Sequence, residues 1–301
     1  MGRIADALRR ADEERRQAME AAAGGAACSL LEPPAPGAGP SGEAADEAPD
    51  APAWPDPAPV VEGLAESLVP LFERSSLITE QYRSLRTRLL SQNPNCEHRV
   101  LAVTSAVPKE GKSVTTLNLG SVLAEIRHLK VLVVDGDFRR GCLARMLNQE
   151  KGPGLADVLA GRASYPAVLR RTPIPNLTFL PAGDTDRHSA AELLASVHTS
   201  AVFKRMLNEF HYTIVDTPPA TTVTDVGIIG QVCSGVIMVI RLHQTDEVAA
   251  KRAVRLLQVN NVAIVGCLLI GRDTPPARYG SGYGYSYNRY YAYYRQTVEE
   301  E

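Results

Sequence analysis

One short run of residues has the composition of a phosphate-binding loop. The segment A-V-P-K-E-G-K-S, Ala106 to Ser113, follows an apolar run and precedes a helical pattern. A glycine lets a helix N-terminus approach phosphate closely, a lysine adds positive charge, and a serine hydroxyl can bind Mg²⁺. The octet matches G-x-x-x-x-G-K-[ST] except that Ala106 replaces the first glycine, so a plain strand-to-helix turn is the alternative. The predicted nucleotide contacts are Ala106, Pro108, Lys109, Glu110, Gly111, Lys112, Ser113 and Val114.

Three aspartates follow apolar runs elsewhere in the chain. Asp135 and Asp137 lie in V-V-D-G-D-F, and Asp216 lies in T-I-V-D-T-P-P. An aspartate that ends a strand beside a phosphate loop is well placed to bind Mg²⁺ or to orient a nucleophile. Each could instead cap a helix or a turn. Neighbouring carboxylates repel one another unless a cation lies between them, which favours the magnesium interpretation for the group as a whole.

Short apolar runs alternate with helical patterns, and this alternation predicts the elements that would bring these residues together. The predicted buried strands are 100–104, 130–134, 177–180, 212–215, 236–240 and 262–269. Helices are predicted over 189–210, over 245–259 and after Ser113. Such a pattern indicates an α/β fold with a doubly wound, mostly parallel sheet, in which ligands bind at the carboxyl ends of the strands.

A further helix is predicted before the first strand. Its apolar residues share one side and predict a core-facing stripe: Ile78, Tyr82, Leu85 and Leu89. Glu80, Arg83 and Arg86 project from other angles as an E-x-x-R-x-x-R series. This series could pair across a subunit boundary, or it could be a solvated face with local ion pairs.

Composition divides the chain of 301 residues into four predicted parts. Residues 1–20 can form a short charged helix, and 21–70 form an acidic linker rich in Ala and Pro, predicted to be disordered. An α/β domain that contains the phosphate loop follows over 71–273, and a tyrosine-rich tail over 274–301. No apolar run reaches the ~18 residues of a membrane span, and the N-terminus lacks a secretory signal, so a cytoplasmic location is expected.

The tail contains eight of the 11 tyrosines, interleaved with glycine and serine. They are Tyr279, Tyr283, Tyr285, Tyr287, Tyr290, Tyr291, Tyr293 and Tyr294. This composition cannot build a core, so the phenols are free to reach another molecule. Stacking on single-stranded nucleic acid is the alternative, but few arginines lie among the tyrosines and the net charge is −2, so no nucleic-acid partner is expected.

The sequence resembles the bacterial tyrosine kinases of the P-loop type, cytoplasmic enzymes that act in polysaccharide synthesis and export. The segments that carry the resemblance occur in family order: E-Q-Y-R-S-L-R-T-R-L, T-S-A-V-P-K-E-G-K-S, V-L-V-V-D-G-D-F-R-R, G-L-A-D-V-L-A-G, L-T-F-L-P-A-G, A-E-L-L-A-S, T-I-V-D-T-P-P and the tyrosine cluster. The resemblance implies a P-loop fold akin to that of partition ATPases, with ATP and Mg²⁺ as cofactors.

The resemblance also implies roles for particular residues. Lys112, Asp135 and Asp137 match catalytic positions, with Asp135 as the candidate that activates the tyrosine hydroxyl. Ser113, Asp137 and Asp216 match the Mg²⁺ ligands, and the eight tail tyrosines match the phosphate acceptors. Glu80, Arg83 and Arg86 match the family's oligomerisation motif, through which subunits form a ring.

Three partners are implied in the same way: further copies of the chain, a transmembrane polysaccharide copolymerase that activates the kinase at the inner face of the membrane, and a cognate phosphotyrosine phosphatase. Two positions depart from related patterns. Ile270 replaces an asparagine found near the base in many relatives, and Val107 stands where partition ATPases carry a second lysine. The competing hypotheses are a partition-type ATPase switch and a weakly catalytic scaffold of an export complex.

Overall fold

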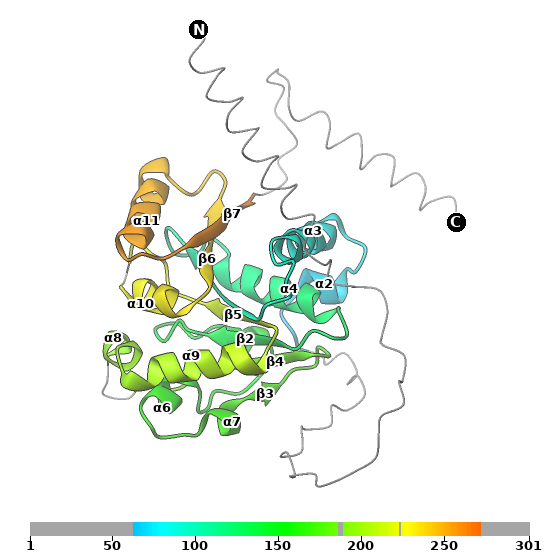
Figure 1. Ribbon diagram of the computed structural model, residues 1–301. Helices are drawn as coiled ribbons and strands as arrows, with labels where there is room; N and C mark the ends of the chain where they lie inside the picture. The colour runs from blue at the N-terminus through cyan, green and yellow to red at the C-terminus, as the bar shows by residue number, and fades with distance from the viewer. Residues whose placement is uncertain (1–62, 186–188, 223, 272–301) are drawn as a thin grey trace, which may run out of the picture. The chain divides into compact units, whose positions relative to one another are not determined.

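The structure, a computed structural model, describes residues 63–185, 189–222 and 224–271. Its strands are β1 Arg99–Ser105, β2 Val131–Asp135, β3 Arg170–Arg171, β4 Leu177–Leu180, β5 Tyr212–Asp216, β6 Gly235–Arg241 and β7 Ile264–Ile270. They form one sheet in the order β3-β4-β2-β5-β1-β6-β7 (Figure 1). Every neighbouring pair is parallel except β3 with β4. The predicted mostly parallel sheet is confirmed, and β3 is an addition to the predicted strands.

Helices cover both faces of this sheet (Figure 1). They are α2 Val69–Phe72, α3 Leu77–Ser91, α4 Lys112–Ala124, α5 Leu143–Met146, α6 Leu155–Leu159, α7 Tyr165–Val168, α8 Ala190–Leu194, α9 Val197–Glu209, α10 Asp225–Val232 and α11 Glu247–Val259. Because side chains alternate along a strand, β1 sends Leu101 and Val103 into the core beneath α3 and α4. Val100 and Ala102 enter the opposite core, which α9, α10 and α11 cover.

The strand predicted over 262–269 is present as β7, but it is not buried. It lies at the end of the strand order with β6 as its neighbour, and Leu269 is 60% exposed. An edge strand has a neighbour on one side only, so an apolar sequence there does not ensure burial.

The single helix predicted over 189–210 is two helices, α8 and α9. Ser189 caps α8 by accepting from the backbone N–H of Glu192, whose carboxylate accepts in turn from the N–H of Ser189. Ser196 has extended backbone (φ −65°, ψ 153°) and serves as the N-cap of α9. A serine hydroxyl can compete for backbone groups, as that of Ser189 does. The hydroxyl of Ser196 makes no capping hydrogen bond to the backbone and lies 3.4 Å from the hydroxyl of Thr199.

The packed structure begins earlier than the boundary predicted at residue 71. Leu64 and Leu68 are buried in the core on the α4 side, and the side-chain amide of Asn118 donates to the carbonyl of Ser67 at 2.9 Å. The end of the predicted linker, residues 63–70, is therefore part of the folded domain. The acidic, proline-rich composition of the linker as a whole does not predict that these two leucines, four residues apart, are buried.

The stripe predicted on α3 is partly wrong. Tyr82 and Leu89 are buried, whereas Ile78 is 45% exposed in the first turn of the helix. No helix in the described part of the chain has the length and hydrophobicity that a membrane crossing needs. The predicted helix of residues 1–20, the linker to residue 62 and the tail from 272 onward lie outside the described residues.

Candidate nucleotide site

The predicted phosphate loop connects the end of β1 with the start of α4. Gly111 is the N-cap of α4 and has left-handed backbone (φ 91°), and Lys109 is also left-handed (φ 68°). Glycine adopts this conformation without steric cost, so it suits the sharp turn into the helix. The first turn of α4 has free backbone N–H groups and the positive end of the helix dipole, both of which favour an anion.

The loop residues differ in how far they face solvent. Pro108 and Lys109 are exposed, Val114 is half-buried, and Ala106 is fully buried. Glu110 is also fully buried, with its carboxylate bonded inside the protein. Only the backbone of Glu110 is therefore free to contact phosphate, which narrows the contact predicted for this residue.

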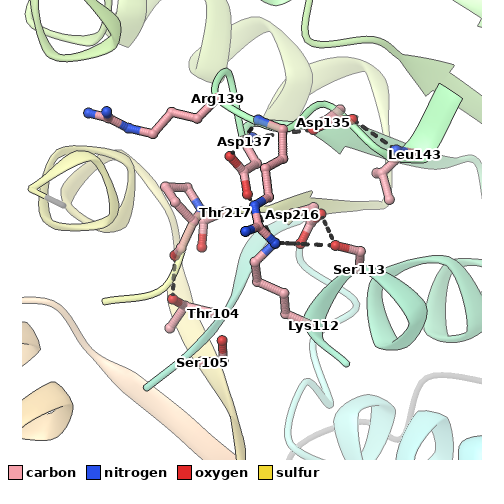
Figure 2. A network of polar contacts seen from close by, with 12 residues as sticks. Thr104, Ser105, Lys112, Ser113, Asp135, Asp137, Arg139, Leu143, Asp216 and Thr217 are labelled. Carbon is pink, nitrogen blue, oxygen red and sulfur yellow. Dashed lines mark hydrogen bonds and ion pairs between the residues drawn. The ribbon is translucent and has the colours of Figure 1, made fainter. Parts of the chain in front are cut away.

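The charged side chains predicted for the site meet at the carboxyl edge of the sheet (Figure 2). Lys112 Nζ lies 3.1 Å from Asp137 Oδ2, 3.6 Å from Asp216 Oδ1 and 3.2 Å from Ser113 Oγ. The hydroxyl of Ser113 donates to Asp216 Oδ2 at 2.6 Å. Asp135 stands opposite Asp216 in the register of β2 and β5. The three aspartates thus share one site with Lys112 and Ser113.

Backbone contacts fix the orientation of Asp135. Its carboxylate accepts from the N–H of Leu143 at 3.0 Å and from the N–H of Asp137 at 3.3 Å. Gly136, between the two aspartates, donates its N–H to the carbonyl of Asp216 at 2.8 Å. A Cβ at Gly136 would lie only 2.8 Å from the same oxygen, so glycine is required where the β2 loop crosses β5.

Burial shifts the proton equilibria of these groups. Burial raises the pKa of Asp135 to about 7, and the neighbouring Asp216 carboxylate adds to the rise. Burial likewise raises the pKa of Asp216, to about 6, although the Lys112 ammonium opposes the rise. Burial alone would lower the pKa of Lys112, but the carboxylates of Asp216 and Asp137 outweigh it and raise the pKa. Removing carboxylates from water disfavours their charged form.

These residues fit a magnesium ion. Three buried carboxyl groups face one ammonium, so full ionisation leaves negative charge that a cation would balance. Asp216 Oδ1 has no hydrogen-bond partner among the described residues, although it is buried. The described residues contain no group of three or more His, Cys, Asp or Glu side chains suited to a metal. Mg²⁺ usually takes one or two carboxylates, with water and substrate phosphates as its other ligands.

The predicted interface residues of α3 make contacts within one chain. Arg83 binds Glu125, just after α4, through two hydrogen bonds of 3.0 Å and 2.7 Å, and it pairs with Glu80 at 2.7 Å. Arg86 lies 2.6 Å from Glu125 Oε2 and donates to the carbonyl of Val122 at 2.6 Å. The motif thus connects α3 to the end of the phosphate-loop helix.

Several residues at the site or on the elements that support it had no signal in the sequence. Glu125 belongs to no motif, and neither does Thr245, whose hydroxyl donates to Glu110. Cys142, a free thiol, interacts with Ser113 and is buried enough to raise its pKa. Arg139 points away from Asp135, Asp137 and Asp216 (Figure 2), and its Nε lies 3.4 Å from Asp225 Oδ2 on α10. The eight tail tyrosines lie outside the described residues.

Comparison with known proteins gives consistent results. The AAA domain family matches residues 99–258. The EpsB protein of Ralstonia nicotianae is 32% identical over 214 residues, which cover 71% of this chain and 28% of EpsB. Tyrosine-protein kinase YwqD of Bacillus subtilis is 29% identical over 222 residues, covering 74% of this chain and 92% of YwqD. The kinase domain of the Escherichia coli tyrosine kinase ETK superposes with a TM-score of 0.66 at 25% identity, covering 72% of this chain and 84% of that domain.

The chain spans little more than a quarter of the length of EpsB, but nearly all of YwqD. A P-loop family of this kind implies nucleotide binding together with Mg²⁺, in agreement with the cluster of Lys112, Ser113 and the three aspartates. The chain therefore belongs to the AAA domain family, in the group that contains the bacterial P-loop tyrosine kinases.

Proposed function

We propose that the protein is an ATP-dependent protein-tyrosine kinase that phosphorylates the C-terminal tyrosines of neighbouring copies of itself. The observation that carries the proposal is the meeting of Lys112, Ser113 and the three aspartates at the carboxyl edge of β1, β2 and β5. Phosphoryl transfer depends mainly on positioning and charge stabilisation, and these groups supply both.

Each residue of the site has a proposed role. Lys112 balances the negative charge of the transferred phosphoryl group, while Ser113, Asp137 and Asp216 would hold Mg²⁺. The ion, when bound, neutralises charge on the phosphates. Asp135 takes the proton of the attacking phenol, and its raised pKa of about 7 suits a base that works near neutral pH. The phenol oxygen bonds to the γ-phosphorus of ATP, the bond from this phosphorus to the bridging oxygen breaks, and ADP leaves.

The proposed acceptors are the eight tyrosines of the tail: Tyr279, Tyr283, Tyr285, Tyr287, Tyr290, Tyr291, Tyr293 and Tyr294. Each phosphate would add about −1.5 to −2 charges at neutral pH. Successive phosphates would repel one another and the acidic residues 299–301. A modified tail would then bind less well to the site of a neighbouring copy.

The partners belong to the same proposal. Copies of the chain would assemble into a ring through Glu80, Arg83 and Arg86. A transmembrane polysaccharide copolymerase would recruit the cytoplasmic kinase to the inner face of the membrane and activate it, and a phosphatase would reverse the modification. Support comes from the family resemblance and from the placement of these three residues on the outer helix α3. The proposed process is the regulation of exopolysaccharide synthesis and export.

Incubation of the purified chain with Mg-ATP, followed by phosphopeptide mapping, tests the function. We expect phosphotyrosine in the tail of the wild type and none in Lys112→Met. Phosphate release without tail labelling would favour a partition-type switch, and the absence of both would favour a scaffold. Repeating the assay with a candidate membrane partner tests activation.

A further inference from the structure

A buried carboxylate connects the phosphate loop to a distant segment of the chain. One oxygen of Glu110 accepts from the backbone N–H of Val107 at 2.8 Å, which closes the loop on itself. The other oxygen accepts from the hydroxyl of Thr245, in the segment between β6 and α11. The same hydroxyl accepts from the backbone N–H of Arg241 at 2.8 Å. The Thr245 hydroxyl therefore uses its donor and an acceptor position within one partly buried network.

This network contains the groups that offset the cost of burying Glu110. The Glu110 side chain is inaccessible to solvent, and a buried carboxylate is costly unless hydrogen bonds satisfy it. Of the two loop lysines, Lys109 is exposed and Lys112 is directed to Asp137 and Asp216 instead. Loss of the Thr245 hydroxyl would leave both Glu110 Oε1 and the N–H of Arg241 without this partner.

Two outer contacts join the same two segments. The guanidinium of Arg241 donates to the carbonyl of Lys109 at 3.1 Å. The side-chain amide of Gln244 lies 3.5 Å from the carbonyl of Pro108. Residues 107–110 are thus each held by a hydrogen bond, and the contacts of 108–110 come from the 241–245 segment.

We propose that Thr245 is a positioning residue for nucleotide binding. Its hydroxyl holds Glu110, and Glu110 holds the loop in the shape in which its backbone N–H groups converge on phosphate. A loop that is already ordered loses less conformational entropy when the ligand binds, so affinity depends on this contact. The inference rests on nucleotide binding at the loop and is independent of tyrosine phosphorylation.

Nucleotide affinity is the first test, measured by calorimetry with Mg-ADP on the full chain. Thr245→Val keeps the shape of the side chain and removes the hydroxyl, and we expect the Kd to rise about tenfold, since an unpaired buried polar group is penalised. Thr245→Ser retains the hydroxyl and should return the Kd to within about threefold of the wild type. An effect of lost packing would not be reversed by this smaller residue.

A matched control is available on β5. The hydroxyl of Thr213 is buried and has no hydrogen-bond partner among the described residues, so Thr213→Val makes the same substitution without breaking such a contact. Its Kd for Mg-ADP should equal that of the wild type. Glu110→Gln changes the other partner of the same contact. In a protein that already carries Glu110→Gln, adding Thr245→Val should raise the Kd for Mg-ADP much less than it does in the wild type.

The second readout needs no nucleotide. The N–H of Val107 is bonded to Glu110, so hydrogen exchange at this amide should be faster in Thr245→Val than in the wild type or Thr213→Val. Unchanged affinity in Thr245→Val, or failure of Thr245→Ser to restore it, overturns the proposal. If Thr245→Val does not fold, Glu110→Gln decides: weaker Mg-ADP binding with faster Val107 exchange supports the proposal, and wild-type values overturn it. If the wild type binds Mg-ADP but its tail is not labelled in the presence of Mg-ATP, the kinase function is contradicted and the proposal for Thr245 is not.

Discussion

At the level of single residues, the site buries more carboxyl groups than its ion pairs can neutralise. Asp135, Asp137 and Asp216 lie almost without solvent contact, yet the ion pairs of this cluster among the described residues come from one ammonium, that of Lys112, which pairs with Asp137 and Asp216. Full ionisation of this cluster is unfavourable in the absence of a cation. The same surplus of negative charge is what would attract Mg²⁺ together with a nucleotide. The nucleotide-free protein should therefore be sensitive to pH through these groups.

Stability of the nucleotide-free protein should decrease as the pH rises toward 7. Burial raises the pKa of Asp135 to about 7, whereas in the unfolded chain this carboxyl titrates near its ordinary value of 3.8. Between these values the folded state holds a proton that the unfolded state has lost. The stabilising contribution is therefore complete below the unfolded pKa and is lost as the pH rises through the folded pKa.

Urea unfolding at about pH 5 and about pH 8 measures this effect. Over this interval the wild type should lose on the order of 2–4 kcal/mol more of its free energy of unfolding than Asp135→Asn loses. Equal losses in the two proteins would show that Asp135 titrates normally.

Gly136 provides a steric test of the same cluster. A Cβ at this position would lie 2.8 Å from the carbonyl oxygen of Asp216 and 3.0 Å from Val215 Cγ1. Gly136→Ala should destabilise the fold by about 1–3 kcal/mol and weaken nucleotide binding, because β2 and β5 must separate. Gly266→Ala on β7 is the control, since a Cβ there has no atom within 4 Å. Comparable losses of stability in both variants would contradict the close approach.

At the level of elements, the site depends on three parallel strands that end together and on the helix that follows the first of them. β1 leads into the phosphate loop, β2 ends at Asp135 and β5 ends at Asp216. α4 lies under α2 and α3, and nearly all of its residues are buried. The short segment before α3 is thus part of the support for the phosphate loop.

Packing of this segment can be tested with one buried and one exposed residue. Leu68 is fully buried against the α4 side of the sheet, and Leu68→Ala should lower the free energy of unfolding by about 2–4 kcal/mol. Ile78 is 45% exposed, so Ile78→Ala should change stability far less, by about 0.5 kcal/mol. Thermal or urea unfolding compares the two. A negligible effect of Leu68→Ala would instead support the domain boundary at residue 71 that composition predicts.

Local patterns in the sequence predict most of this arrangement. Near-continuous apolar runs identify β1, β2, β4, β5 and β6, and the phosphate loop and aspartates are visible because each motif is contiguous. Contacts between distant segments leave no such pattern, which is why Thr245 and Glu125 were missed. Ile78 and β7 were predicted to be buried because periodicity gives the apolar side of an element but not how far its neighbours extend over it.

At the level of the whole molecule, the proposed kinase works only in an assembly, because a tail must reach the site of another copy. Within one copy, Arg83 and Arg86 bind Glu125, and both arginines keep part of their surface exposed. They could therefore bind a second copy while they hold α3 against α4.

The double variant Arg83→Ala/Arg86→Ala should reduce the average molar mass measured by light scattering during size-exclusion chromatography. Two guanidiniums proposed to cross the subunit boundary are lost. Arg205→Ala is the matched control, because Arg205 is an exposed arginine of α9 that pairs with Glu209 on its own helix. An unchanged mass in the double variant would place the interface elsewhere.

Transfer between copies can be measured most directly by mixing two complementary variants. One carries Lys112→Met and an intact tail, and the other has a wild-type site with all eight tail tyrosines replaced by phenylalanine. With Mg-ATP, neither protein alone should gain tail phosphotyrosine, whereas the mixture should gain it on the Lys112→Met chain. If the mixture gains none while the wild-type chain labels itself, transfer occurs within one copy. Labelling of the Lys112→Met chain on its own would show that the site built around Lys112 is not the catalytic one.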